Sequence, residues 1–183
     1  IHELGFSFVP ANGTQYFPLI WLAKQFHVPW YVFADGEALP LQRLDEALQR
    51  AGEGDHVACD NVIVIDGGRN FEGMLVNEGY LPQIEAALDQ FSGAPGALDR
   101  YIMKYNGKPR KGGGIRVYGV PGGREIAAKD YMSSLKTRLA KPLAQLISTH
   151  GDANRRFPSH IESLFNKMDE RYSIGRVGST GNE

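Results

Sequence analysis

The amino-acid sequence predicts an α/β fold in which helices flank a parallel sheet. Two short apolar runs, "WYVFA" at 30–34 and "VIVI" at 62–65, are continuous rather than alternating, which is typical of parallel strands buried on both faces. Segments with apolar residues at helical spacing lie before and between these runs, at 17–27 and at about 40–51. Strands and helices in this order predict right-handed crossovers within one parallel sheet.

The chain begins with a predicted strand. Residues 5–10, "GFSFVP", would place Phe6 and Phe8 on one face, and the turn "ANGT" follows. The first helix tolerates Pro18, because proline fits a first helical turn, and "HVP" at 27–29 ends it. The predicted apolar stripes of the first two helices are Leu19, Leu22 and Phe26, and Leu41, Leu44, Leu48 and Ala51.

Helical patterns dominate the rest of the chain. The clearest is "LPQIEAALDQF", and a Gly/Pro break separates it from "ALDRYIMKY". Pro142 lies inside a later helical pattern, so it must fall in a first turn or mark a break. The tail from residue 173 is polar and Gly-rich, and we expect it to fray. Three further helices are predicted, over 126–135, about 139–150 and 158–171.

Residues 106–123 read as a mobile loop, because seven glycines and two prolines are spaced by basic residues. We expect a β-hairpin within it at "IRVYGV". The loop contains no G-x-x-x-x-G-K-[ST], and no G-x-G-x-x-G leads from a strand into a helix, so a flexible connection is favoured over a nucleotide cradle.

Basic residues are concentrated around this loop. From Arg100 to Arg124 there are seven basic residues and no acid, although the net charge of the chain is only −1. Such a segment can meet phosphates through charge alone. The alternative is a solvated loop. The residues expected to contact DNA are Lys108, Arg110, Lys111 and Arg116.

The composition is that of an ordinary soluble globular protein, with 183 residues, 42% hydrophobic and 22% charged. The sequence has no apolar run long enough for a membrane span and no leader-like start. Cys59 is the only cysteine, which excludes disulfides and Cys-rich zinc sites within the chain and fits a cytoplasmic setting. Because the sequence starts at Ile1, immediately before a predicted strand, we expect it to be a piece of a longer protein.

Two carboxylates, Asp35 and Glu37, follow the predicted strand at 30–34. Residues two apart in extended backbone point to the same side, so both can converge on one cation at the end of the sheet where ligands bind. Oxygen ligands of this kind select Mg²⁺ or Mn²⁺. The alternative is a turn at Asp35 with a solvent-facing Glu37. Asp66 follows the next strand, but its "DGG" is first of all a turn.

The stretch "LGFSFVPANGTQYFPLIWLAKQFHVPWYVFADGEA" resembles the Toprim domain of OLD-family (overcoming lysogenization defect) nucleases. The matching features are the strand, the Asn-Gly turn with a following aromatic, the helix ending in "FHVPWYVF" and the acidic strand end. "NVIVIDGGRNFEGMLVNEGYLPQIEAAL" and "SLKTRLAKPLAQLI" resemble later segments of that family. The likeness covers roughly residues 1–90 and 130–165.

This resemblance implies a Toprim (Rossmann-like) parallel sheet flanked by helices, with a mostly helical insert. It divides the chain into a Toprim core at 1–91, an insert with the basic Gly-rich loop at 92–124, C-terminal Toprim helices at 125–172 and a flexible tail at 173–183. The expected activity is endonucleolytic cleavage of DNA with two divalent ions, Mg²⁺ or Mn²⁺.

The resemblance also implies the metal ligands Asp35, Glu37 and Glu72. For Glu72 the alternative is a helix-surface acid or a cap. Two features depart from the family. Its first Toprim glutamate would precede Ile1, and its usual Asp-x-Asp appears here as Asp-x-Glu.

A lysine ahead of a late helix is a further feature of the family. Lys136 fits it by its spacing from Ala140 and Ala144, whereas Lys141 precedes Pro142 and reads as a solvated helix-start residue. A preorganised ammonium at this place would stabilise charge that builds on phosphate oxygens in the transition state.

The implied partners are DNA and an N-terminal ABC-type ATPase domain of the same protein, through which members dimerise; no membrane partner is expected. Some members act in defence against phage. Two rival functions stay open. One is another Toprim enzyme, such as a primase or a topoisomerase, although a topoisomerase needs a nucleophilic tyrosine on a separate domain. The other is a non-catalytic α/β module that binds ligands or partners.

Overall fold

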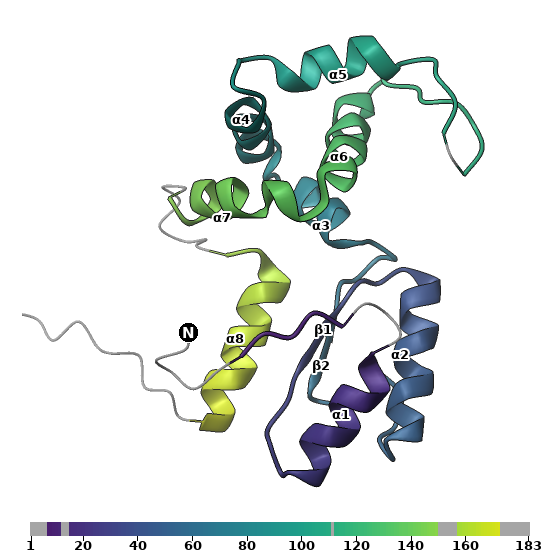
Figure 1. Ribbon diagram of the computed structural model, residues 1–183, viewed down its shortest axis with the longest axis vertical. Coiled ribbons are helices and arrows are strands. Elements are labelled where there is room, and N and C mark those ends of the chain that lie inside the picture. The colour runs from purple at the N-terminus through teal and green to yellow at the C-terminus, as the bar shows by residue number, and fades with distance from the viewer. Residues whose placement is uncertain (1–6, 12–14, 111, 150–156, 173–183) are drawn as a thin grey trace, which may run out of the picture. The chain divides into compact units, whose positions relative to one another are not determined.

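The computed structural model describes residues 7–11, 15–110, 112–149 and 157–172, except the side chains of residues 136, 171 and 172. The chain divides into two compact units, Ile1–Asn70 with Glu162–Glu183, and Phe71–Ile161. The first unit holds α1 (Tyr16–Gln25), β1 (Val32–Ala34), α2 (Ala38–Arg50), β2 (Val62–Val64) and most of α8 (Ser159–Tyr172). The second holds α3 (Phe71–Asn77), α4 (Leu81–Ser92), α5 (Ala97–Tyr105), α6 (Gly123–Leu135), the 3₁₀ turn η2 (Lys136–Leu139) and α7 (Ala140–Ser148) (Figure 1).

The sheet of the first unit is parallel. Val32 lies opposite Val62, Phe33 opposite Ile63 and Ala34 opposite Val64, and α2 crosses over from one strand to the other. Among the described residues the sheet has two strands. The predicted α/β class and the parallel pairing of the two apolar runs are confirmed.

Different helices cover the two faces of this sheet. Val32 and Val62 belong to a core built with residues of α1 and α2. Phe33 and Ile63 belong to a second core, which contains Met168 of α8. Neighbouring strand residues alternate between the two cores because successive side chains along a strand point to opposite faces. Burial on both faces explains why the two runs are continuously apolar.

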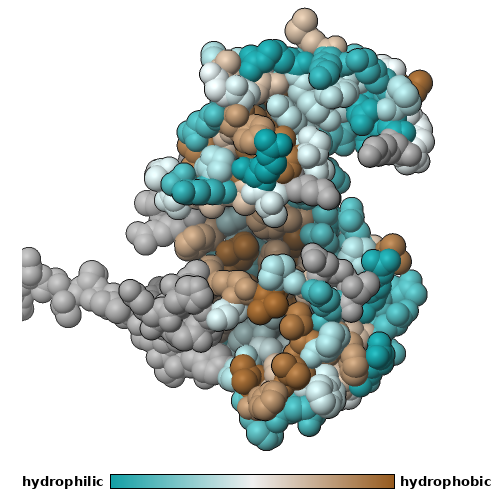
Figure 2. All heavy atoms as spheres, in the orientation of Figure 1, coloured by the Kyte–Doolittle hydropathy of each residue, from teal (hydrophilic) through white to brown (hydrophobic). Residues whose placement is uncertain are grey.

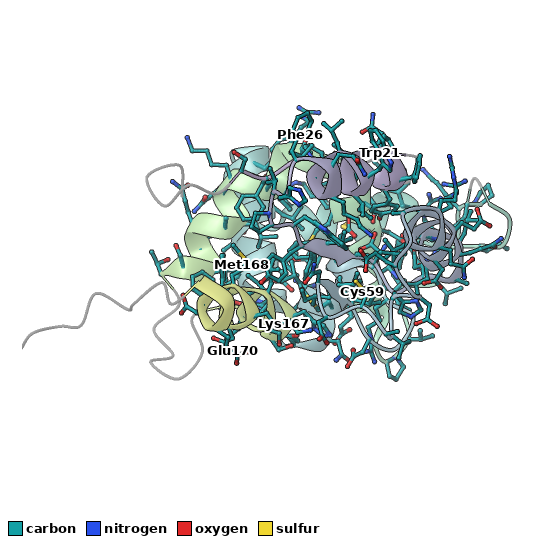
Figure 3. All side chains as sticks on the ribbon, turned by 90° about the horizontal axis from the view of Figure 1, so that it is seen from below. Trp21, Phe26, Cys59, Lys167, Met168 and Glu170 are labelled. Atoms are coloured by element: carbon teal, nitrogen blue, oxygen red, sulfur yellow. The ribbon has the colours of Figure 1, made fainter. Side chains whose placement is uncertain are left out.

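Two hydrogen bonds fix α8 against the first unit. The Tyr31 hydroxyl donates to the carbonyl oxygen of Lys167 (3.2 Å), and the Lys167 ammonium donates to the carbonyl oxygen of Asp60 (2.8 Å). In Figure 3, Met168 points from α8 toward the body of the unit, whereas Glu170 points away from it. The predicted last helix is confirmed. It covers one face of a sheet whose strands lie about a hundred residues earlier in the sequence.

The described part of the predicted first strand is not a strand. Residues 7–10 are neither helix nor strand, and Phe8 and Val9 are 61% and 62% exposed. A strand with an apolar face needs a surface against which to bury that face, and these side chains have none. Residues 5–6 and 12–14, which complete the predicted strand and turn, lie outside the described residues.

The buried face of α1 differs from the predicted stripe. Tyr16 and Ile20 are buried, whereas Leu22 and Phe26 are 50% and 71% exposed. Figure 3 shows Trp21 and Phe26 on the outer side of α1, and Figure 2 shows apolar side chains at the surface of the first unit in this region. Within the described ranges no helix is long and apolar enough to cross a membrane.

The second unit is a cluster of helices held together by a buried core and by one arginine. Ile84 and Leu88 of α4 are fully buried. Arg124 of α6 donates to both carboxylate oxygens of Glu85 on α4 (2.6 and 2.8 Å) and also pairs with Asp99 on α5. Hydrogen bonds to Glu85 first, and then to Asp99, raise the pKa of Arg124 above its ordinary value. One guanidinium thus joins three helices.

The predicted helices of this unit are confirmed as α4, α5, α6 and α7. Pro142 lies in the first turn of α7, where its missing N–H is tolerated. The hairpin lies earlier in the sequence than predicted. The Arg116 N–H donates to the Lys108 carbonyl oxygen (2.9 Å) and the Gly107 N–H to the Arg116 carbonyl oxygen (2.8 Å), so the hairpin spans 107–116 rather than "IRVYGV" at 115–120.

Candidate functional site

Carboxylates follow both strands of the sheet in the first unit. Asp35 and Glu37 come directly after β1, and Asp66 comes two residues after the end of β2. Because β1 and β2 are parallel, these residues lie beyond the same end of the sheet. In open parallel sheets ligands bind at the carboxyl ends of the strands.

Gly36 joins the two strand ends. Its N–H donates to the Arg69 carbonyl oxygen (2.7 Å), and a Cβ added at Gly36 would overlap the carbonyl oxygen of Ile65. The close approach of two backbones leaves room only for glycine. The sequence signal for this joint is the Asp35-Gly36 pair, for which a turn was one of the two alternatives.

Asp35 is half-buried and lies near a buried tyrosine. Burial of Tyr16 raises the pKa of its hydroxyl, and the negative charge of Asp35 raises it further. The charge of Asp35 therefore acts on a residue of α1, which the sequence did not indicate.

Glu37 and Asp66 are both exposed. Glu37 has extended backbone (φ −69°, ψ 144°) immediately before α2, and its side chain makes no capping hydrogen bond to that helix. The Asp66 carboxylate lies 3.2 Å from the guanidinium of Arg69 in an ion pair across a turn. The turn predicted at "DGG" is therefore present, with Gly67 and Gly68 at positive φ.

The chemistry of these donors suits a hard divalent cation, because Mg²⁺ and Mn²⁺ prefer carboxylate oxygens. Among the residues that the structure describes, no group of three or more His, Cys, Asp or Glu side chains is placed to hold a metal ion. What the structure shows of Asp35, Glu37 and Asp66 is that they follow two neighbouring parallel strands.

The other predicted site residues belong to the second unit. Glu72 is half-buried in the first turn of α3, where a negative charge is favoured by the helix dipole. Lys136 is the first residue of η2, and its side chain lies outside the described part. Lys141 is exposed in the first turn of α7, beside Pro142, as expected of a solvated helix-start residue.

Four of the seven basic residues between 100 and 124 are bound by the second unit itself. Arg116 donates to the carbonyl oxygen of Pro109 within the hairpin. Arg100 donates to Ser92 Oγ (3.1 Å) and to the Ala94 carbonyl oxygen (3.0 Å). Arg110 forms an ion pair with Asp130 of α6 (2.8 Å). Arg124 is the helix-joining residue described above. Lys111 lies outside the described residues.

Asp130 also binds the segment that follows the hairpin, through a tyrosine. The buried Tyr118 donates its hydroxyl to Asp130 (2.7 Å), and its N–H donates to Asn106 Oδ1 (2.8 Å). Burial of the Tyr118 hydroxyl, and then its hydrogen bond to Asp130, raise its pKa well above the ordinary value. The loop predicted to be mobile is thus tied to α6 at two points.

Comparisons of the chain with protein-family models, with curated proteins and with solved structures found no match.

Proposed function

We propose that this chain is the nuclease part of a Toprim enzyme of the OLD type, which hydrolyses phosphodiester bonds of DNA with Mg²⁺ or Mn²⁺ bound at the carboxyl end of β1. The observation that carries the proposal is a parallel pair of strands with a carboxylate after each, Asp35 after β1 and Asp66 after β2. The order of elements around this pair and the resemblance of the sequence support the same assignment.

Asp35 is the central ligand in this proposal and Glu37 is its partner. Both follow β1. Gly36 lies between them, and its backbone is held by the hydrogen bond to Arg69 and by the close approach of Ile65. A further carboxylate is expected from the segment that precedes Ile1 in the family pattern. Bound divalent ions would activate the attacking water and stabilise the leaving oxygen.

Residues of the second unit have supporting roles in the proposal. Glu72 is a further candidate ligand, and Lys136, with Lys141 as the alternative, would stabilise negative charge on the phosphate oxygens. The partners would be DNA and an ATPase domain of the same protein.

The test is Asp35→Asn in the full-length protein, with Asp60→Asn as a control that removes an exposed acid of the same unit. Asn keeps the size of the side chain and removes its charge. Asp35→Asn should fold normally, lose metal binding measured by calorimetry, and lose plasmid nicking by at least about 10²-fold. Asp60→Asn should behave like the wild type.

Full nicking by Asp35→Asn at ordinary Mn²⁺ concentrations would overturn the assignment. A wild-type protein that neither binds Mn²⁺ nor nicks plasmid would favour the rival function, a non-catalytic α/β module.

A further inference from the structure

Three cations of the second unit gather around one aromatic ring. The charged groups of Lys104, Lys108 and Arg116 lie 5.2, 5.6 and 5.6 Å from the centroid of the Tyr105 ring. We call these four residues the Tyr105 cluster. They come from the last turn of α5 and from both arms of the hairpin. Attraction between a cation and the face of an aromatic ring holds such groups in place.

Within the described part of the second unit, the positive charge of this cluster is not balanced by a negative one, although Arg116 donates to the neutral carbonyl oxygen of Pro109. Among the described residues, no carboxylate forms an ion pair with Lys104, Lys108 or Arg116, in contrast to Arg110 and Arg124. Both lysines are exposed, and Figure 2 shows a mainly hydrophilic surface along α5. Three like charges around one ring repel one another, so an anion bound there would be stabilised by all three.

Packed aromatic rings and the anchored hairpin hold the Tyr105 cluster in place. Tyr105 contacts Tyr101 (ring centroids 4.6 Å apart), and Tyr101 stacks on Tyr131 of α6 at 4.4 Å with an interplanar angle of 11°. The hairpin that carries Lys108 and Arg116 is fastened to α6 through Asp130. The cations are therefore held together before any ligand arrives, which lowers the entropic cost of binding.

We propose that the Tyr105 cluster is the surface by which the second unit holds the phosphate backbone of DNA, without reading its bases. Lys104 and Tyr105 join Lys108 and Arg116 in this role. Arg110 is excluded from it, because its charge is already balanced by Asp130. The choice of DNA as the polyanion rests on the proposed function, whereas the preference for an anionic ligand follows from the three cations of the cluster.

The experiment measures the salt dependence of DNA binding by fluorescence anisotropy, with EDTA present and in the Asp35→Asn background, so that no cleavage occurs. Lys104→Gln, Lys108→Gln and Arg116→Gln are compared with Arg43→Gln, which removes the same charge from an exposed position on α2. A labelled duplex and one of its strands are titrated separately at about 50 to 200 mM salt.

Each cluster substitution should flatten the log–log slope by about 0.9 on duplex or about 0.7 on single-stranded DNA, and Arg43→Gln should leave it unchanged. The DNA form that shows these losses is the form that the cluster holds. Tyr105→Phe keeps the ring and should keep the slope.

The double variant Lys104→Gln/Lys108→Gln changes the two exposed lysines of the cluster. An unchanged salt-dependence slope in this variant, or no DNA binding by the parent protein, would overturn the inference. Failure of the proposed function gives a different result. In that case the cluster variants still flatten the slope, but the wild-type protein does not nick DNA in Mn²⁺.

Discussion

At the scale of single residues, Gly36 decides how closely the two strand ends approach. A methyl group there would overlap the Ile65 carbonyl oxygen, and backbone cannot swing aside as the end of a flexible side chain can. We expect Gly36→Ala to destabilise the first unit by about 3 kcal/mol, the upper end for added bulk in a packed site. The chain's two tryptophans, Trp21 and Trp30, both lie in this unit, so urea unfolding followed by tryptophan fluorescence measures the effect.

Gly68→Ala is the matched control for this prediction. Gly68 lies in the same unit at positive φ (67°), but nothing stands within 4 Å of an added Cβ. Its replacement should therefore cost only the strain of left-handed backbone, about 1 kcal/mol. Equal losses for the two variants would show that the backbone contact at Gly36 is unimportant.

At the scale of an element, Asp130 decides whether the hairpin at 107–116 stays fastened. Asp130→Asn removes the ion pair with Arg110 and the charged acceptor of the Tyr118 hydroxyl. The loss should be about 1.5 kcal/mol, the low end for a hydrogen bond to a charged group, because both partners of the ion pair are partly exposed. Amide hydrogen exchange should become faster at Gly107 and Arg116, whose N–H groups close the hairpin.

The same variant has a pH signature. The pKa of Tyr118 is raised in the folded protein, so the stability it contributes is complete below the ordinary tyrosine value and is lost as pH rises above it. Asp130→Asn should lower that pKa, and tyrosinate absorbance during an alkaline titration measures the change. Hairpin exchange and tyrosine titration that both match the wild type would contradict this account of the anchor.

The elements differ in how well the sequence predicted them. β1, β2 and α4 were predictable because their apolar patterns record the surfaces that they bury, whereas the apolar residues at 5–10 predicted a strand that the described residues 7–10 do not form. The face of α1 was not, because Leu22 and Phe26 match a buried stripe as well as Tyr16 and Ile20 do. The hairpin was misplaced because its anchor, Asp130, lies on the following helix and gives no signal within the loop.

The candidate site was likewise predictable only in part. The position of Asp35 and Glu37 directly after a buried strand could be predicted, because the apolar run and the acids that follow it are visible in the sequence. The role of Gly36 could not, since it depends on the approach of Ile65 and Arg69 from the next strand. Which basic residues bind carboxylates of the second unit, and which do not, could not be predicted, because it depends on the positions of those carboxylates in the fold.

At the scale of the whole molecule, the first unit is assembled from two distant parts of the chain. In the sequence, residues 71–161 separate the strands of the sheet from most of α8, the helix that covers the second face of that sheet. Met168→Ala should destabilise the first unit by about 2–5 kcal/mol, because the side chain is 8% exposed in that core. Tryptophan fluorescence during urea unfolding measures this loss.

The control is the same chemical change at Met103, which is 84% exposed on α5. Met103→Ala should stay within about 0.5 kcal/mol of the wild type. If Met168→Ala were equally silent, α8 would contribute nothing to the stability of the sheet.

This discontinuity sets an order of events during synthesis on a ribosome. The strands emerge first, but the helix that buries Phe33 and Ile63 is made roughly a hundred residues later, a delay of about 5–20 s at about 5–20 residues per second. The inserted unit has all its segments available before then and can complete its fold first. For those seconds one apolar face of the nascent sheet is bare, which makes it a natural binding target for a chaperone that waits at the tunnel exit.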